Sequence, residues 1–169
     1  MTKFLLSLHV LAAIIAVGPV TVAASMFPPS ARKALAEPGS ERAAAAVRLL
    51  HRICRVYGGV GIAVPVLGFA TAMSMGVLND AWLIVSMLLT ALAAMVLLAL
   101  VLPRQEEILA GLGGSGTGSP ATGTADTATG TAVDTRATAR LAMFTGVFNL
   151  LWATVTILMI VRPGSTTGA

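Results

Sequence analysis

The chain has 169 residues, of which 56% are hydrophobic and only 11% are charged, and its mean hydropathy is +0.88. A water-soluble domain of this size needs a charged surface, so these values exclude one and indicate a membrane protein. The length also excludes a large enzyme with a separate catalytic domain. The single cysteine excludes a disulfide framework and a cysteine-based zinc site.

Four apolar stretches, each without Asp, Glu, Lys or Arg over about twenty residues, are long enough to cross a bilayer as helices. They predict an all-α polytopic membrane protein with a single domain over residues 1–169. We expect its four-helix transmembrane bundle to be built from helices at about 4–27, 53–77, 81–102 and 140–162.

The first stretch also has features of a cleavable signal peptide, because Lys3 precedes an apolar run and residues 22–24 imitate a cleavage site. The apolar run continues to Phe27, which is longer than the core of a typical leader. Cleavage would also place the basic segment that follows outside the cell. A retained transmembrane helix is therefore favoured over a leader.

Nine of the eleven basic residues lie on one side of the predicted bundle. They occupy the connection after the first helix, the start of the second helix, and the connection between the third and fourth: Arg32, Lys33, Arg42, Arg48, Arg52, Arg55, Arg104, Arg136 and Arg140. The positive-inside rule therefore places both long connections in the cytoplasm and both termini outside. The pI of about 10.2 then reflects topology and contact with anionic lipid, and it does not require nucleic-acid binding.

Residues 28–47 are expected to form a basic cytoplasmic loop. Pro28 and Pro29 predict the end of the first helix, because proline removes a backbone donor. Ser40 is a plausible N-cap for a helix that begins near Glu41.

Arginines on the cytoplasmic part of the second helix share one face. They follow one another at steps of four and three, at Arg48, Arg52 and Arg55. This face either binds lipid headgroups or is simply solvated.

Residues 111–137, the other cytoplasmic connection, are rich in Gly, Thr, Ala and Ser. Such a segment lacks apolar residues that would offset the entropy of ordering. We therefore expect this connection to be disordered.

Small residues recur at steps of three and four along the helices, the pattern that lets helix backbones approach closely in lipid. The stripes that predict helix packing lie on the second and fourth helices, at Gly58, Gly61, Pro65, Gly68, Ala72 and Gly76 and at Gly146, Asn149 and Ala153. The Asn149 amide, which needs a partner within hydrocarbon, predicts an interhelical hydrogen bond.

His9 is an ionisable side chain within the apolar part of the first predicted span, which makes it a candidate functional residue. One interpretation is structural, with neighbouring hydroxyl groups satisfying a neutral imidazole. The other is a cofactor or metal ligand: an axial nitrogen for haem b, or a copper site completed by Met73, Met87 or Met159. His51 lies about 25 Å from the level of His9 by helix rise, which argues against a bis-histidine haem within one chain.

The opening of the first helix, Leu8-His9-Val10-Leu11-Ala12-Ala13, carries a resemblance. The chain resembles small uncharacterised bacterial four-helix membrane proteins. Over about its first 30 residues it is distantly similar to the copper-resistance D membrane domain and to HemJ-type haem proteins. The resemblance implies cofactor binding at His9. Those families usually follow the histidine with tryptophan and paired glycines, whereas residues 16–19 here are Ala-Val-Gly-Pro. The bias toward Ala, Gly and Arg is typical of a high-GC actinobacterium.

No acid or lysine lies within the predicted spans, so a proton relay or an ion-coupled carrier lacks its usual parts. Phosphate-loop, zinc and serine-nucleophile motifs are also missing from the sequence. We therefore expect a non-catalytic accessory or scaffolding subunit of a bacterial plasma membrane, in contact with the bilayer and with other membrane proteins or a second copy. The alternatives are a haem- or copper-binding protein that uses His9, and a small-solute transporter with Asn149 and Thr90 on its path.

Overall fold

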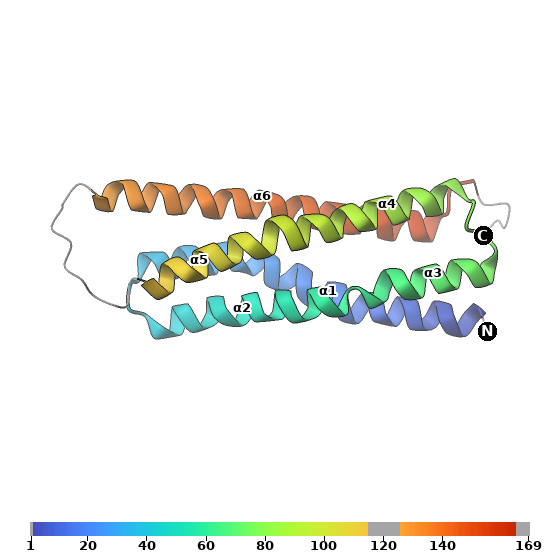
Figure 1. The fold of residues 1–169 in the computed structure, drawn as a ribbon, viewed down its shortest axis with the longest axis horizontal. Helices are drawn as coiled ribbons and strands as arrows, with labels where there is room; N and C mark the ends of the chain where they lie inside the picture. Colours follow the sequence, from blue (N-terminus) through green and yellow to red (C-terminus); the bar gives the residue numbers. More distant parts are fainter. Residues whose placement is uncertain (1, 115–125, 165–169) are drawn as a thin grey trace.

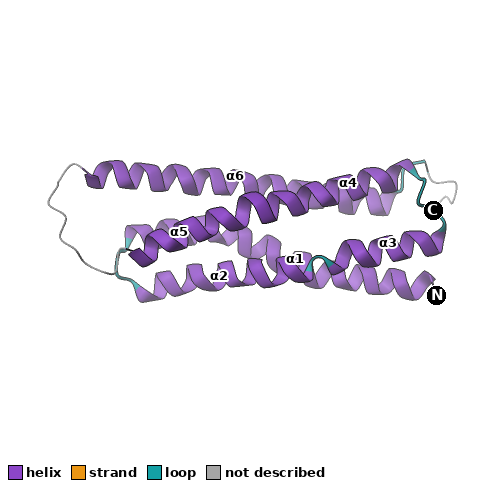
Figure 2. Cartoon of the chain, in the orientation of Figure 1, coloured by secondary structure: helices purple, strands orange, loops and turns teal. Residues whose placement is uncertain are grey.

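The computed structural model describes residues 2–114 and 126–164. The described chain is helical throughout, apart from short turns (Figure 2). Its elements in chain order are α1 (Thr2–Ala36), α2 (Glu41–Val60), α3 (Ala63–Met75), α4 (Ala81–Met95), the π-helix η1 (Val96–Val101), α5 (Leu102–Gly114) and α6 (Asp126–Val161).

These elements form four long antiparallel rods, because α2 continues into α3 and α4 continues through η1 into α5 (Figure 1). Each rod holds a helical stretch that is long and apolar enough to cross a membrane: Thr2–Ala36, Glu41–Met75, Ala81–Gly113 and Arg136–Val161. The prediction of an all-α chain with four helices long and apolar enough to span a membrane is therefore confirmed. Both chain ends lie at one end of the bundle, which we call the terminal end.

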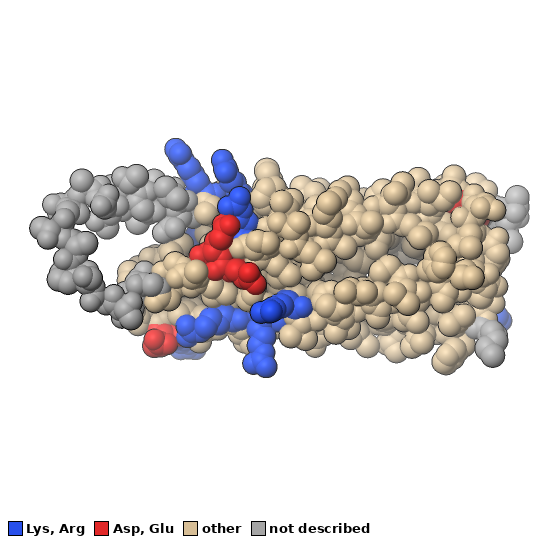
Figure 3. Space-filling view, viewed as in Figure 1, with Lys and Arg blue, Asp and Glu red and all other residues tan. Residues whose placement is uncertain are grey.

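The opposite end, which we call the charged end, carries most of the charged side chains on the face that Figure 3 draws. It holds the connection between α1 and α2 and the start of α6. At about 1.5 Å per residue, the 35 residues of α1 extend about 50 Å, whereas the hydrocarbon core is about 30 Å thick. α1 is therefore longer than the hydrocarbon is thick.

The prediction that Pro28 and Pro29 end the first helix is wrong, because α1 continues through both prolines to Ala36. A proline accepts helical dihedral angles and removes only the hydrogen bond of its missing N–H. Packing offsets that loss, since Phe27 and Ala31 on the same helix are fully buried. The predicted loop over 28–47 is thus two helix ends joined by a short turn at 37–40.

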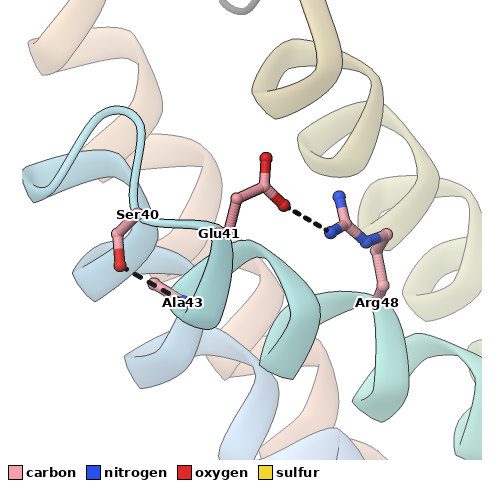
Figure 4. Close-up of polar contacts among 4 residues, drawn as sticks. All are labelled: Ser40, Glu41, Ala43 and Arg48. Atoms are coloured by element: carbon pink, nitrogen blue, oxygen red, sulfur yellow. Dashed lines mark hydrogen bonds and ion pairs between the residues drawn. The ribbon is translucent and has the colours of Figure 1, made fainter.

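The α2 N-terminus follows the sequence prediction. The Ser40 side chain accepts a hydrogen bond from the Ala43 backbone N–H at 3.4 Å, and the helix begins at Glu41 (Figure 4). In the same view Arg48 donates to a Glu41 carboxylate oxygen at 3.4 Å. Both side chains of this ion pair are largely exposed, so it contributes little to stability.

Two further prolines explain where the other rods deviate from a regular helix. Pro65 offers no N–H to the Gly61 carbonyl, which accepts from Val64 instead, and α2 breaks from α3 at residues 61–62. Pro103 likewise has no N–H to donate to the preceding turn of its helix. That turn widens into the π-helix η1, in which the Leu102 N–H donates to the Leu97 carbonyl five residues earlier.

Two parts of the segment 111–137, for which the sequence predicts disorder, are described by the structure. Residues 111–114 continue α5, and residues 126–137 form the first turns of α6. The helix is anchored from its apolar side, since Thr138 and Leu141 are fully buried. Propagating a helix costs far less than nucleating one, so the anchored turns extend into the Thr/Ala-rich sequence. Residues 115–125 lie outside the described residues.

Core packing is uneven along the bundle. The main cluster runs from the charged end to the middle and includes Phe27, Val47, Val101, Leu141 and Phe148, whereas the terminal end holds a small cluster of Ala72, Trp82 and Leu83. The hydrophobic effect stabilises burial where the bundle meets water, and it is absent between helices in lipid. Among the helices that reach the terminal end, α3 packs mainly on α1, and α6 packs on both α4 and α1.

Candidate functional site

The candidate ligand His9 is held against α3. Its Nδ1 atom lies 3.0 Å from the Val64 carbonyl oxygen. A carbonyl can only accept, so Nδ1 donates, and in a neutral ring the lone pair is then on Nε2. The ring also lies on Gly68, where an added Cβ would come within 2.9 Å of His9 Cε1. A side chain at position 68 would therefore have to push the His9 ring aside.

The three candidate sulfur ligands lie in different surroundings. Met73 and Met87 are exposed on the outside of the bundle. Met159 packs beside Ala72 and Trp82. Among the described residues, no group of three His, Cys, Asp or Glu side chains could hold a metal ion.

A polar cluster near the charged end was missed by the sequence reasoning. Gln105 on α5 is fully buried, and its side-chain oxygen lies 3.1 Å from His51 Nδ1. Its amide nitrogen donates to Cys54 Sγ at 3.6 Å, and Glu106 lies 3.7 Å from His51 Nε2. Contacts with Gln105 and Glu106 of α5 therefore orient the His51 ring.

The residues singled out for helix packing have different environments. Ala72 is buried, and a Cβ on Gly58 would touch Leu97 of η1 at 3.4 Å. Gly76 ends α3 with a φ of 70°, a conformation that favours glycine. Gly146 and Ala153 are exposed, because α6 turns larger residues inward, at Leu141, Thr145, Phe148 and Val155.

The predicted lipid-headgroup residues Arg48, Arg52 and Arg55 are all exposed on α2. Basic side chains gather at the charged end on the face that Figure 3 shows. The α2 arginines thus remain accessible to phosphates.

A cavity of about 100 Å³ lies at the middle of the bundle. Small residues of the α2–α3 break, Gly58, Gly61 and Pro65, form one wall, and Thr90 and Ala94 of α4 form another. The drawn surface is hollowed between α3 and α4 (Figure 3). The lining is mostly apolar, so the cavity suits a hydrocarbon group rather than a hydrated solute.

A second, more polar groove of about 200 Å³ lies between α1 and α6. Its lining residues are Ser25, Pro28, Pro29, Arg32, Ala142, Thr145, Gly146 and Asn149. The Asn149 amide donates to Ser25 Oγ at 3.0 Å, which links α6 to α1. Thr90 lines the central cavity and Asn149 lines this groove, so the two residues suggested for a transport path belong to separate sites.

The four long apolar helices define a multi-pass integral membrane protein that contacts the lipid bilayer. No protein-family model matches the chain, and no curated protein or solved structure matches it either. The helix 1 resemblance to copper-resistance D and HemJ-type proteins therefore gains no support from a family match.

Proposed function

We propose that the protein is a non-catalytic accessory or scaffolding subunit of a bacterial plasma membrane, with the charged end in the cytoplasm and both termini outside. The observation that carries this proposal is the incomplete closure of the bundle. α3 packs mainly on α1, and α4 packs on α6, beside a cavity walled by small residues.

Small residues favour a protein partner at this opening. Gly61, Pro65 and Ala94 let another helix backbone approach closely, which is how helices associate in lipid. The occupant we propose is a transmembrane helix of a partner membrane protein.

Cysteine cross-linking in native membranes tests this function. With Cys54 replaced by serine, single cysteines at Ile62 and Leu98 report on the rim of the cavity, because both residues line it and are exposed. Leu150, exposed on α6 away from the cavity, is the matched control. We expect a discrete adduct with one partner from the rim positions only. Equal adducts from all three positions, or a monomer without a co-purifying partner in mild detergent, would contradict the proposal.

A second candidate function, binding of haem b or copper through His9, is favoured by one observation. Metal-bound histidines commonly donate their other ring N–H to a backbone carbonyl, and His9 Nδ1 makes this contact with Val64. An absorbance scan and metal analysis on the wild type and His9→Ala test it. A Soret band or bound copper that the substitution abolishes is expected, and a colourless, metal-free wild-type protein excludes it.

A further inference from the structure

The groove between α1 and α6 combines three features that a closed helix pair lacks: unpaired buried polar atoms, a free volume and a neighbouring guanidinium group. We propose that it binds one anionic glycerophospholipid of the leaflet at the charged end, with the phosphate at Arg32 and the glycerol-ester region against Thr145 and Asn149. This site is independent of the cavity on which the proposed function rests.

The first argument is the unsatisfied hydrogen-bonding capacity inside the groove. Thr145 is only 3% exposed, and its hydroxyl oxygen has no hydrogen-bond partner. The Asn149 Oδ1 atom is also buried and has no hydrogen-bond partner, although the Asn149 amide nitrogen donates to Ser25 Oγ. Buried polar groups normally have partners, so both atoms indicate a polar ligand in the groove.

The prolines of α1 leave two backbone acceptors without helical donors; water or a headgroup hydroxyl can pair with such a carbonyl, whereas an ester group cannot. Pro28 and Pro29 have no N–H, so the carbonyls of Ala24 and Ser25 lose their regular helical donors. Both prolines line the groove. This stretch of α1 is therefore more polar than its apolar side chains imply.

The depth of the groove matches the part of a lipid that carries its polar groups. By helix rise, Arg32 lies about 10 Å from Ser25 along α1, and Arg140 lies about 13 Å from Asn149 along α6. The lining residues thus extend about two helical turns from the level of the basic side chains into the apolar span. Lipid phosphates lie at the first level, and the ester groups lie just below it.

The charge at the mouth of the groove selects a phosphate. Arg32 is exposed, and no carboxylate of the described residues forms an ion pair with it. Arg140 follows on α6 at the same end. A guanidinium group binds phosphate through paired charge-assisted hydrogen bonds.

The volume is large enough for more than a single bound water. About 200 Å³ exceeds the share of liquid volume of a single water molecule, about 30 Å³, several times. In the bound state the Thr145 hydroxyl donates to an ester carbonyl. An ester group only accepts, so the Asn149 amide turns over in the bound state: its Oδ1 atom accepts from the Ser25 hydroxyl, and its Nδ2 atom donates to a second ester oxygen.

Native mass spectrometry of the purified chain in mild detergent tests the site with added phosphatidylglycerol and, for comparison, phosphatidylcholine. Arg32→Gln is expected to weaken the phosphatidylglycerol adduct about tenfold, because it removes a charged hydrogen-bond donor to phosphate. The matched control is Lys33→Gln, the neighbouring exposed cation that does not line the groove. Equal losses in the two variants would show unspecific charge attraction and overturn the proposal.

Thr145→Val supplies a test that does not depend on charge. Without lipid the variant should unfold at a higher temperature than the wild type, because it removes an unpaired buried hydroxyl at nearly constant shape. Added phosphatidylglycerol should then raise its unfolding temperature less than it raises that of the wild type. Thr154→Val is the control, since that hydroxyl already donates to the Leu150 carbonyl.

Inorganic phosphate distinguishes a lipid from a free anion. We expect millimolar phosphate neither to stabilise the protein nor to displace phosphatidylglycerol. Stabilisation by phosphate that Arg32→Gln abolishes would assign the groove to a soluble anion. A phosphatidylglycerol shift that survives both Arg32→Gln and Thr145→Val would place the lipid elsewhere.

Discussion

At the residue scale, the contact between His9 and Gly68 is the tightest constraint within the spans. Sequence reasoning identified both residues, one as a polar group in hydrocarbon and the other as part of a small-residue stripe. It did not pair them, because the pairing depends on the rotation of α1 against α3. The structure places the imidazole directly on the glycine, with Nδ1 on the Val64 carbonyl.

Gly68→Ala should therefore destabilise the protein by about 1–3 kcal/mol, the usual cost of overpacking. The added methyl group must displace the His9 ring and lengthen its hydrogen bond. Thermal unfolding in detergent measures the effect. Gly59→Ala, where a Cβ meets nothing within 4 Å, is the control and should be neutral or stabilising. A Gly68→Ala protein as stable as this control would contradict the contact.

Gln105→Leu is a second prediction at this scale. The substitution keeps the buried volume roughly constant but removes the partner of His51 and of the Cys54 thiol. Leaving buried polar groups unpaired costs about 1–3 kcal/mol, so the unfolding temperature should fall. His51→Leu in the same background should recover part of the loss, because it removes the unpaired imidazole. If the losses of stability from Gln105→Leu and His51→Leu simply add in the double variant, the two side chains are not coupled.

Gln105 could not be predicted as a site residue from the sequence. It follows Pro103 at the end of a long apolar run, in a position typical of a solvated helix end. Its burial depends on η1, which shifts the helical phase of α5. A π-helix of this kind leaves no clear signal in hydrophobic periodicity.

At the element scale, hydropathy predicted the spans well because one force dominates them. Charged side chains are excluded from hydrocarbon, so the charge-free stretches coincide with the apolar stretches of the helices. The helix ends were harder to predict. α1 passes Pro28 because Phe27 and Ala31 are buried against neighbouring helices, a tertiary effect that local propensity does not contain.

The face of α6 that packs into the bundle could not be predicted from the sequence either. The chain is rich in alanine, and small residues occur on more than one face of this helix. Leu141, Thr145 and Phe148 face the bundle, while Gly146 and Ala153 are exposed. Which face of α6 packs into the bundle depends on the shape of the neighbouring helices, and the sequence of α6 alone does not contain that information.

The prediction at this scale concerns the turn at 37–40. Ser40→Ala should lower stability by about 0.5–1 kcal/mol, because the α2 N-terminus loses its side-chain acceptor for the Ala43 N–H. Thermal unfolding compares it with Ser7→Ala, whose exposed hydroxyl bonds to the Lys3 carbonyl within a helix. If Ser7→Ala were the more harmful substitution, the cap would not stabilise α2.

At the scale of the whole molecule, the bundle has two differently stabilised ends. The charged end buries large apolar side chains from α1, α2, η1 and α6. The terminal end has only a small apolar cluster, formed by Ala72, Trp82 and Leu83. Prolines line both openings, Pro65 at the central cavity and Pro28 and Pro29 at the polar groove between α1 and α6.

The most direct test of the account is the side of the membrane on which each turn lies. With Cys54 replaced by serine, single cysteines at Glu37 and Asn79 are treated with a membrane-impermeant maleimide in intact cells and after permeabilisation. We expect Asn79→Cys to react in intact cells, and Glu37→Cys to react only once the membrane is opened. Labelling of Glu37→Cys in intact cells to the same extent as Asn79→Cys would contradict a bundle that crosses the membrane four times with its charged end inside.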